Sequence, residues 1–124
     1  MIYVDKGKEQ EQFIAFAEHA LSILAEENYA SFLTLFDSSR LAEQDIILAL
    51  KYLDESRSAI KVDNPAQLKR ENQGVDIYRY NDGSGYGMDY DLTTDGASND
   101  LTIQIDFLKQ EEGYLVVLED LHTL

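Results

Sequence analysis

The first half of the chain shows the spacing of amphipathic helices. Between Lys8 and Ala25 the apolar side chains recur every three or four residues, which places them in one stripe along a helix. Asn28 can cap a second helical segment, because its side chain can accept a hydrogen bond from a free N–H group of the next turn. The spacing leaves open whether these segments form one bent helix. The stripe consists of Phe13, Phe16, Ala17, Ala20, Leu21, Leu24, Tyr29, Phe32, Leu33 and Phe36.

A third helix is predicted to end at Asp54. The run Asp37-Ser38-Ser39 has the residue types of a helix N-cap, and helical spacing of apolar residues follows it. These residues are Leu41, Ile46, Ile47, Leu50 and Leu53. Stripes of this kind usually pack in a core, and we assign them that role here.

After Asn64-Pro65 the hydrophobic period changes to two, which indicates strands. We predict strands over residues 75–80, 86–93, 101–108 and 114–118, and a short additional one from Ser58 to Val62. Residues 81–85 and 111–113 carry the Asn, Asp and Gly of tight turns, and residues 94–100 are predicted to be a loop. The four main strands form an antiparallel meander.

Helices gathered first and strands gathered last indicate an α+β fold. We expect a single domain over residues 1–124, with a helical part at 8–54 and a meander at 75–122. The helices should pack on one face of a curved sheet, because an antiparallel sheet can leave its other face in water.

This order of elements resembles the nuclear-transport-factor-2-like, cystatin-like α+β domains, in which a bent sheet wraps a long helix to form a cone. The stretch from Tyr90 to Thr102 and the ending Leu118-Glu119-Asp120-Leu121-His122 are also similar to small bacterial proteins of unknown function, some of which look like immunity proteins of toxin systems. The resemblance implies a cone-like fold and carries over no catalytic residue.

Charge excludes several classes of partner. The chain carries 24 acidic and 10 basic residues, for a net charge of −14, so nucleic acids and anionic membranes are not expected to bind it. The absence of cysteine excludes disulfides and thiolate chemistry. No apolar run is long enough for a secretory signal or a membrane span, which predicts a soluble cytoplasmic protein.

The motifs for metal, phosphate or catalytic chemistry are incomplete. The stretch from Asp91 to Gly96 resembles a calcium loop, but Thr102 stands where a bidentate Glu is required. The glycines at 83, 85 and 87 join two strands, whereas a phosphate loop joins a strand to a helix. Asp120 and His122 share a strand face, but no nucleophile accompanies them. We therefore expect no metal and no cofactor.

One alternative is a ligand-binding or isomerase-like cavity inside the fold. Its walls would come from aromatic residues that face the core, namely Phe16, Phe32, Tyr86, Tyr90 and Tyr114. Asp89 and Asp91 alternate out of phase with these tyrosines, which argues against an acid and a tyrosine acting together and favours a protein without enzymatic activity.

The same alternation places Asp89, Asp91, Asp106 and Glu119 on the outward face of the sheet. Like charges on neighbouring strands destabilise a sheet, so stability alone would not favour this pattern. We interpret it as a docking face for a basic protein, most concretely a toxin domain that the chain would neutralise as an immunity or antagonist protein. A merely solvated acidic surface and a homodimeric scaffold are the other interpretations.

Overall fold

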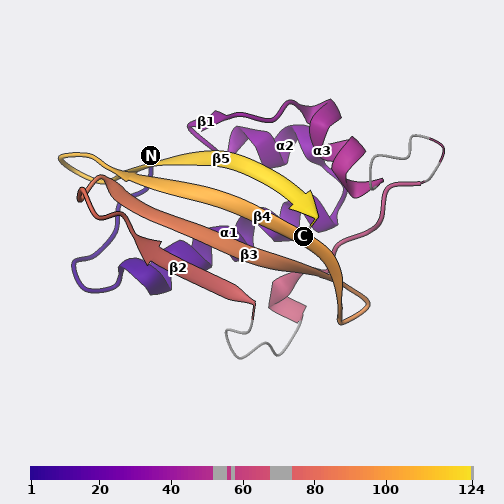
Figure 1. The fold of residues 1–124 in the computed structure, drawn as a ribbon, viewed down its shortest axis with the longest axis horizontal. Coiled ribbons are helices and arrows are strands. Elements are labelled where there is room, and N and C mark those ends of the chain that lie inside the picture. The colour runs from indigo at the N-terminus through magenta and orange to yellow at the C-terminus, as the bar shows by residue number, and fades with distance from the viewer. Residues whose placement is uncertain (52–55, 57, 68–73, 124) are drawn as a thin grey trace.

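The computed structural model describes residues 1–51, 56, 58–67 and 74–123. The helices precede the long strands, which confirms the α+β class (Figure 1). The helices are α1 (Glu9–Ala25), α2 (Tyr29–Thr34), α3 (Glu43–Leu50) and the 3₁₀ turn η1 (Pro65–Gln67). The strands are β1 (Ser38–Ser39), β2 (Val75–Arg79), β3 (Gly85–Thr94), β4 (Ala97–Lys109) and β5 (Tyr114–Thr123).

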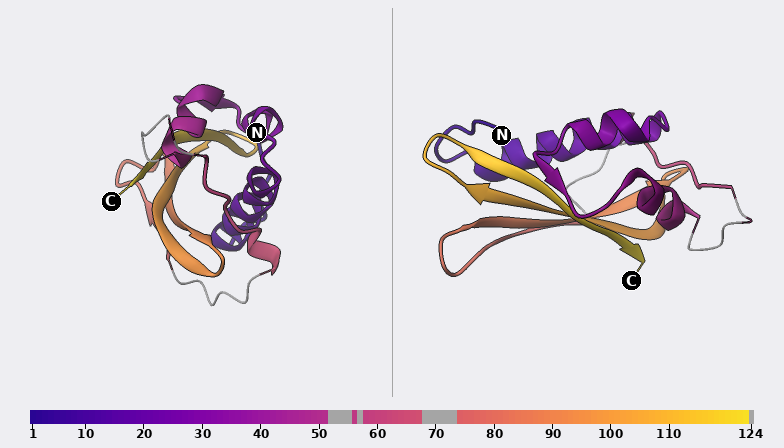
Figure 2. Two further views of the ribbon diagram at one scale, coloured as in Figure 1. Left: turned by 90° about the vertical axis from the view of Figure 1, so that its right-hand side faces the viewer. Right: turned by 90° about the horizontal axis from the view of Figure 1, so that it is seen from above.

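The strands form one five-stranded sheet in the order β1-β5-β4-β3-β2. The four long strands pair antiparallel with their sequence neighbours, as the predicted meander requires. The short β1 pairs parallel to β5 and makes the sheet mixed. Figure 2 shows that the sheet curves over α1. The helix α1 lies against the inner face of the sheet and does not cover the outer face.

The apolar stripe of α1 packs on the inner face of this sheet. Phe13 is fully buried and its ring stacks on that of Phe107 from β4, with 4.1 Å between ring centroids. The inner-face residues of the long strands are buried as well, as in Met88, Ile105 and Val116. Among the described helices, none is long and apolar enough to cross a membrane.

The second helical segment begins where its cap predicts. The side chain of Asn28 accepts a hydrogen bond from the N–H of Ser31, 3.2 Å away, and α2 is separate from α1. Glu27 lies between them with a φ of 61°, a left-handed conformation that interrupts the helix.

The predicted cap at Asp37-Ser38-Ser39 was wrong. Ser38 and Ser39 form β1, and the carboxylate of Asp37 accepts a hydrogen bond of 2.7 Å from the N–H of Val116 in β5. The third helix begins instead at Glu43, where the side chain of Asp45 accepts from the N–H of Ala42. It ends at Leu50, and the predicted continuation through residues 53 and 54 lies outside the described residues.

The predicted loop over 94–100 was also wrong, because β4 already begins at Ala97. Asp95 and Gly96 alone make the turn, with φ of 54° and 81°, the conformation that two-residue hairpin turns require. The carboxylate of Asp63 accepts hydrogen bonds from both their N–H groups and from the hydroxyl of Thr93. This contact is made by residues some 30 positions apart and shortens the loop.

The predicted strand at 58–62 is not formed, since none of these residues belongs to a helix or strand. Hydrogen bonds instead connect Lys61 and Asp63 to the end of β3. The hydroxyl of Thr94 donates to the carbonyl of Lys61, and the N–H of Asp63 donates to the carbonyl of Thr93. Val62 is buried, which explains the apolar character that suggested a strand.

Candidate functional site

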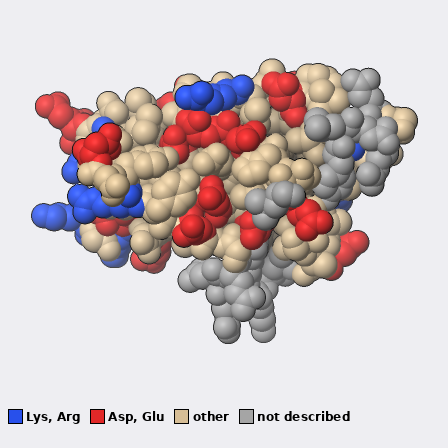
Figure 3. Space-filling model, viewed as in Figure 1, with Lys and Arg blue, Asp and Glu red and all other residues tan. Residues whose placement is uncertain are grey.

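The four acids singled out by strand alternation lie together on the outer face of the sheet, away from α1. Asp89 and Asp91 come from β3, Asp106 from β4 and Glu119 from β5. Each is partly buried, while the residues between them on the same strands are buried on the inner face. Figure 3 shows acidic side chains gathered over these strands.

Two further acids belong to the same face. Asp76 in β2 pairs with Asp89 in β3. Asp89 pairs with Gln104 in β4, and Gln104 pairs in turn with Asp120 in β5. Directly paired residues share a face, so these four form a row across four strands. We call Asp76, Asp89, Asp91, Asp106, Glu119 and Asp120 the acidic face.

Glu119 and Asp120 both point outward because β5 contains a β-bulge. Ile105 pairs with Leu118 and Gln104 with Asp120, which leaves Glu119 as the extra residue. Without this bulge, the strict alternation of β5 would turn Asp120 towards the core. Glu119 was therefore predicted to face outward and Asp120 was not. Asp76 could have been predicted as well, since it alternates with the apolar Val75 and Ile77 of its strand.

The crowding of negative charge perturbs two carboxyl groups. The pKa of Asp89 is raised by its partial burial and by the neighbouring carboxylate of Asp76. The pKa of Glu119 is raised by burial and by its hydrogen bond and charge interaction with Asp106. Both shifts have the direction expected when like charges share a partly desolvated surface.

Two basic groups contact the acidic face among the described residues. The Nε of Arg40 lies 2.6 Å from Oε2 of Glu119, but the Arg40 side chain is 74% exposed. The Nδ1 of His122 lies 3.1 Å from Oδ2 of Asp120 without the geometry of a hydrogen bond, so the pair attracts only when the ring is protonated. These contacts involve Glu119 and Asp120 of the acidic face. In the described part of the chain, no three His, Asp or Glu side chains converge as metal ligands.

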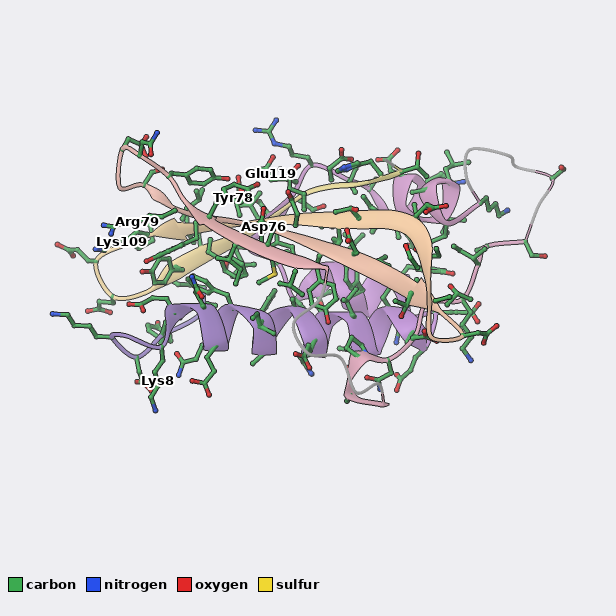
Figure 4. All side chains as sticks on the ribbon, turned by 60° about the horizontal axis from the view of Figure 1, so that its bottom comes forward. Lys8, Asp76, Tyr78, Arg79, Lys109 and Glu119 are labelled. Carbon is green, nitrogen blue, oxygen red and sulfur yellow. The ribbon has the colours of Figure 1, made fainter. Side chains whose placement is uncertain are left out.

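Two tyrosines lie among the acids. The Tyr80 hydroxyl donates a hydrogen bond to Asp106, and the Tyr78 hydroxyl accepts one of 3.2 Å from the amide of Gln104. The Tyr78 ring lies across Gly87, where an added Cβ would come within 2.3 Å of it. In Figure 4, Tyr78, Asp76 and Glu119 lie over the sheet, while α1 lies on its other side. The face therefore combines charge with aromatic surface, as protein interfaces do.

The residues proposed for an interior pocket are mostly part of the core. Phe32 and Tyr90 are 0% and 3% exposed. Phe16 is half-buried and packs on the core, and the half-buried rings of Tyr86 and Tyr114 lie 6.2 Å apart. Tyr86 also lines a surface groove beside α1. A ligand cavity formed by these five stays a prediction.

Removing one charge of the acidic face should stabilise the fold. Asp76→Asn should raise the free energy of unfolding by ~0.5 kcal/mol, because it ends the repulsion with Asp89 directly opposite. Urea denaturation at low salt measures the change, which should shrink at about 1 M NaCl as the charges are screened. A decrease in stability would show that Asp76 makes a favourable contact instead.

The fold and this face together define a small α+β domain with an acidic, tyrosine-containing sheet surface. Residues 21–124 match the model of a family described as a domain of unknown function, DUF7668, and the chain belongs to this family. No curated protein and no solved structure matches it.

Proposed function

We propose that the chain is a protein-binding domain without enzymatic activity, whose acidic face docks a basic protein. The observation that carries this proposal is the row of Asp76, Asp89 and Asp120 across the sheet. Asp76 lies directly opposite Asp89, a pairing that costs stability, and Asp120 follows in the same row beyond Gln104. A partner that neutralises these carboxylates would explain the arrangement.

The details of the face support the same function. Tyr78 and Tyr80 place two rings among the acids, with 5.8 Å between their centroids, and tyrosine is enriched in protein interfaces. Complementary charge would accelerate association and disfavour other partners. These properties suit an immunity or antagonist protein that occludes a basic toxin domain in the cytoplasm.

The proposed relationship to the nuclear-transport-factor-2-like, cystatin-like domains has the support of element order. The long helix α1 packs on the inner face of a curved meander, which is the arrangement of a cone. Docking on the outer face would leave this interior unused.

Charge reversal on the acidic face should abolish most of the binding. The partner to test is a basic toxin domain, sought first among the products of the neighbouring genes, and titration calorimetry measures its affinity at about 50 mM and about 300 mM NaCl. Asp89→Lys with Asp106→Lys should weaken binding at least ~10-fold at low salt, because the variant presents cations to a basic surface.

The matched control is Glu111→Lys with Glu112→Lys, which changes net charge equally in the exposed turn between β4 and β5. This control should stay within ~2-fold of the wild type, and circular dichroism shows whether each variant is folded. An affinity that ignores salt and the reversal at 89 and 106 would reject docking on the acidic face.

A further inference from the structure

The strand β2 lies at the margin of the sheet, where Figure 1 shows it as the lowest strand. Its hydrogen bonds to β3 alternate along the chain. The N–H of Tyr80 donates to the carbonyl of Gly85 at 3.0 Å, and the N–H of Asp91 donates to the carbonyl of Gly74 at 2.7 Å. Because bonded pairs occur at every second residue of an antiparallel ladder, the even-numbered residues of β2 face β3.

The odd-numbered residues of β2 therefore turn their main-chain groups away from the sheet. Val75, Ile77 and Arg79 each present an N–H and a carbonyl along the outer edge, and no described strand pairs with them. The strand has no proline and no bulge, two devices with which proteins protect an edge. This edge can accept an additional strand.

Acidic groups flank the edge on both sides. On the outer side lies Asp76, followed by Asp89 in the next strand. On the inner side, a groove of about 690 Å³ runs along α1 and reaches Tyr86, the register partner of Arg79. The charged residues that line this groove are Lys8, Glu9, Glu11 and Glu18.

We propose that the β2 edge binds an extended, basic segment of the partner as an additional β-strand. This proposal rests on the proposed function and adds the part of the partner that is recognised and its conformation. Main-chain hydrogen bonds from the odd-numbered residues of β2 would hold the segment. Its side chains would contact the residues that lie beside the edge on the two faces of the sheet.

The alternation of a strand defines the sequence of that segment. Side chains on its outer side would lie next to Asp76, at the end of the row of carboxylates. Lysine or arginine is favoured at these positions, because a cation there faces a carboxylate. Side chains on its inner side would lie next to Val75 and Ile77, which are half-buried and pack against the core. The segment should therefore alternate basic and apolar residues.

A second copy of this chain fits the edge less well. If two β2 strands paired antiparallel about Ile77, Asp76 of each copy would face Tyr78 of the other, and the Asp76 and Asp89 pairs of both copies would lie in one sheet. Each copy also carries a net charge of −14. Repulsion between like charges opposes this pairing, whereas a basic segment relieves it.

The probe is a blocked heptapeptide that alternates lysine and valine. Its control carries proline in place of valine, which keeps the charge and prevents strand pairing. NMR titration measures binding, and amide hydrogen exchange measures protection of the main chain. With the lysine–valine peptide bound, the N–H groups of Val75, Ile77 and Arg79 should exchange at least ~10-fold more slowly, and the proline peptide should give no such protection.

A pair of variants at Arg79 separates the main-chain bond from charge. Arg79→Pro removes the outward N–H but keeps the bonds to β3, and should weaken peptide binding ~3- to 10-fold. Arg79→Thr removes the same charge and keeps the N–H, so it should bind as tightly as the wild type or more tightly. Circular dichroism of both variants shows whether β2 is retained.

The outcomes distinguish this inference from the proposed function. The peptide could lose binding when Asp89 and Asp106 are reversed and still leave the N–H groups of Val75, Ile77 and Arg79 unprotected from exchange. That result would place the segment on the acidic face and overturn only the pairing at the edge. Absence of peptide binding would also overturn edge pairing, while calorimetry with the folded partner still decides the acidic face. A wild-type dimer that Arg79→Pro dissociates in analytical ultracentrifugation would assign the edge to a second copy and overturn the inference.

Discussion

Phe13→Ala should lower the free energy of unfolding by about 4 kcal/mol, measured by urea denaturation followed by circular dichroism. Phe13 is fully buried and its ring is in contact with three others. It stacks on Phe107 and meets Tyr114 edge-on, with 5.1 Å between centroids. The substitution removes the side chain that joins α1 to β4 and β5, and the rigid sheet cannot collapse into the space.

Two variants show whether burial or the aromatic ring is responsible. Phe13→Leu should cost less than the alanine variant, because it keeps apolar volume and loses only the ring contacts. Glu11→Ala, on the exposed side of the same helix, should change stability by less than ~0.5 kcal/mol. A loss below ~1 kcal/mol in Phe13→Ala would contradict the packing of α1 on the sheet.

Asp63→Asn should lower the free energy of unfolding by about 2 kcal/mol near pH 7. The Asp63 carboxylate accepts hydrogen bonds of 2.7 Å from Thr93, 3.0 Å from the N–H of Asp95 and 2.9 Å from the N–H of Gly96. An amide has one acceptor oxygen where the carboxylate has two, so the variant leaves part of this donor set without a partner.

The effect should depend on pH. Burial alone would raise the pKa of Asp63, but the hydrogen bonds from Gly96, Thr93 and Asp95 outweigh it and lower the pKa below the ordinary 3.8. A carboxyl group with a lowered pKa in the folded state stabilises the protein above the pKa of the unfolded state. The difference between wild type and Asp63→Asn should be constant above about pH 5 and shrink as the pH falls below about 4.

The control is Asp95→Asn in the same turn. Asparagine adopts the left-handed φ of 54° as readily as aspartate, and this change removes a charge without altering the donors to Asp63. Its stability should stay within ~0.5 kcal/mol of the wild type. Equal losses in both variants, or a difference independent of pH, would show that Asp63 does not act through its carboxylate.

Local pattern predicted the parts of the molecule that depend on burial. The stripe of α1 and the alternation of β3 and β4 each have one face against the core, so the sequence must repeat with the period of the element. Asp89 and Asp91 were placed on the outer face because Met88 and Tyr90 beside them are apolar. Strand alternation also identified Asp106 and Glu119, although their proximity depends on strand order.

Elements held by long-range contacts were missed. Ser38 and Ser39 have the residue types of a helix cap, but they form a strand. The N–H of Val116 donates to the carboxylate of Asp37, and the N–H of Asp37 donates to the carbonyl of Val116. Residues 97–100 have turn-forming side chains, and they join β4 because Asp63 fixes the two-residue turn before them. In both cases the deciding partner is distant in sequence, so no local pattern could reveal it.

The amino-acid sequence by itself determined the α+β class, the order of the elements and the excess of negative charge on the outward positions of the strands, because each follows from hydrophobic period and composition. Only the tertiary structure decided that Asp76 and Asp120 join Asp89 in one row and that Arg40 reaches Glu119. It also decided that β2 lies at one end of the sheet. Register, bulges and strand order arise from pairing between distant segments, and these pairings determine which charges and hydrogen-bonding groups a partner can reach.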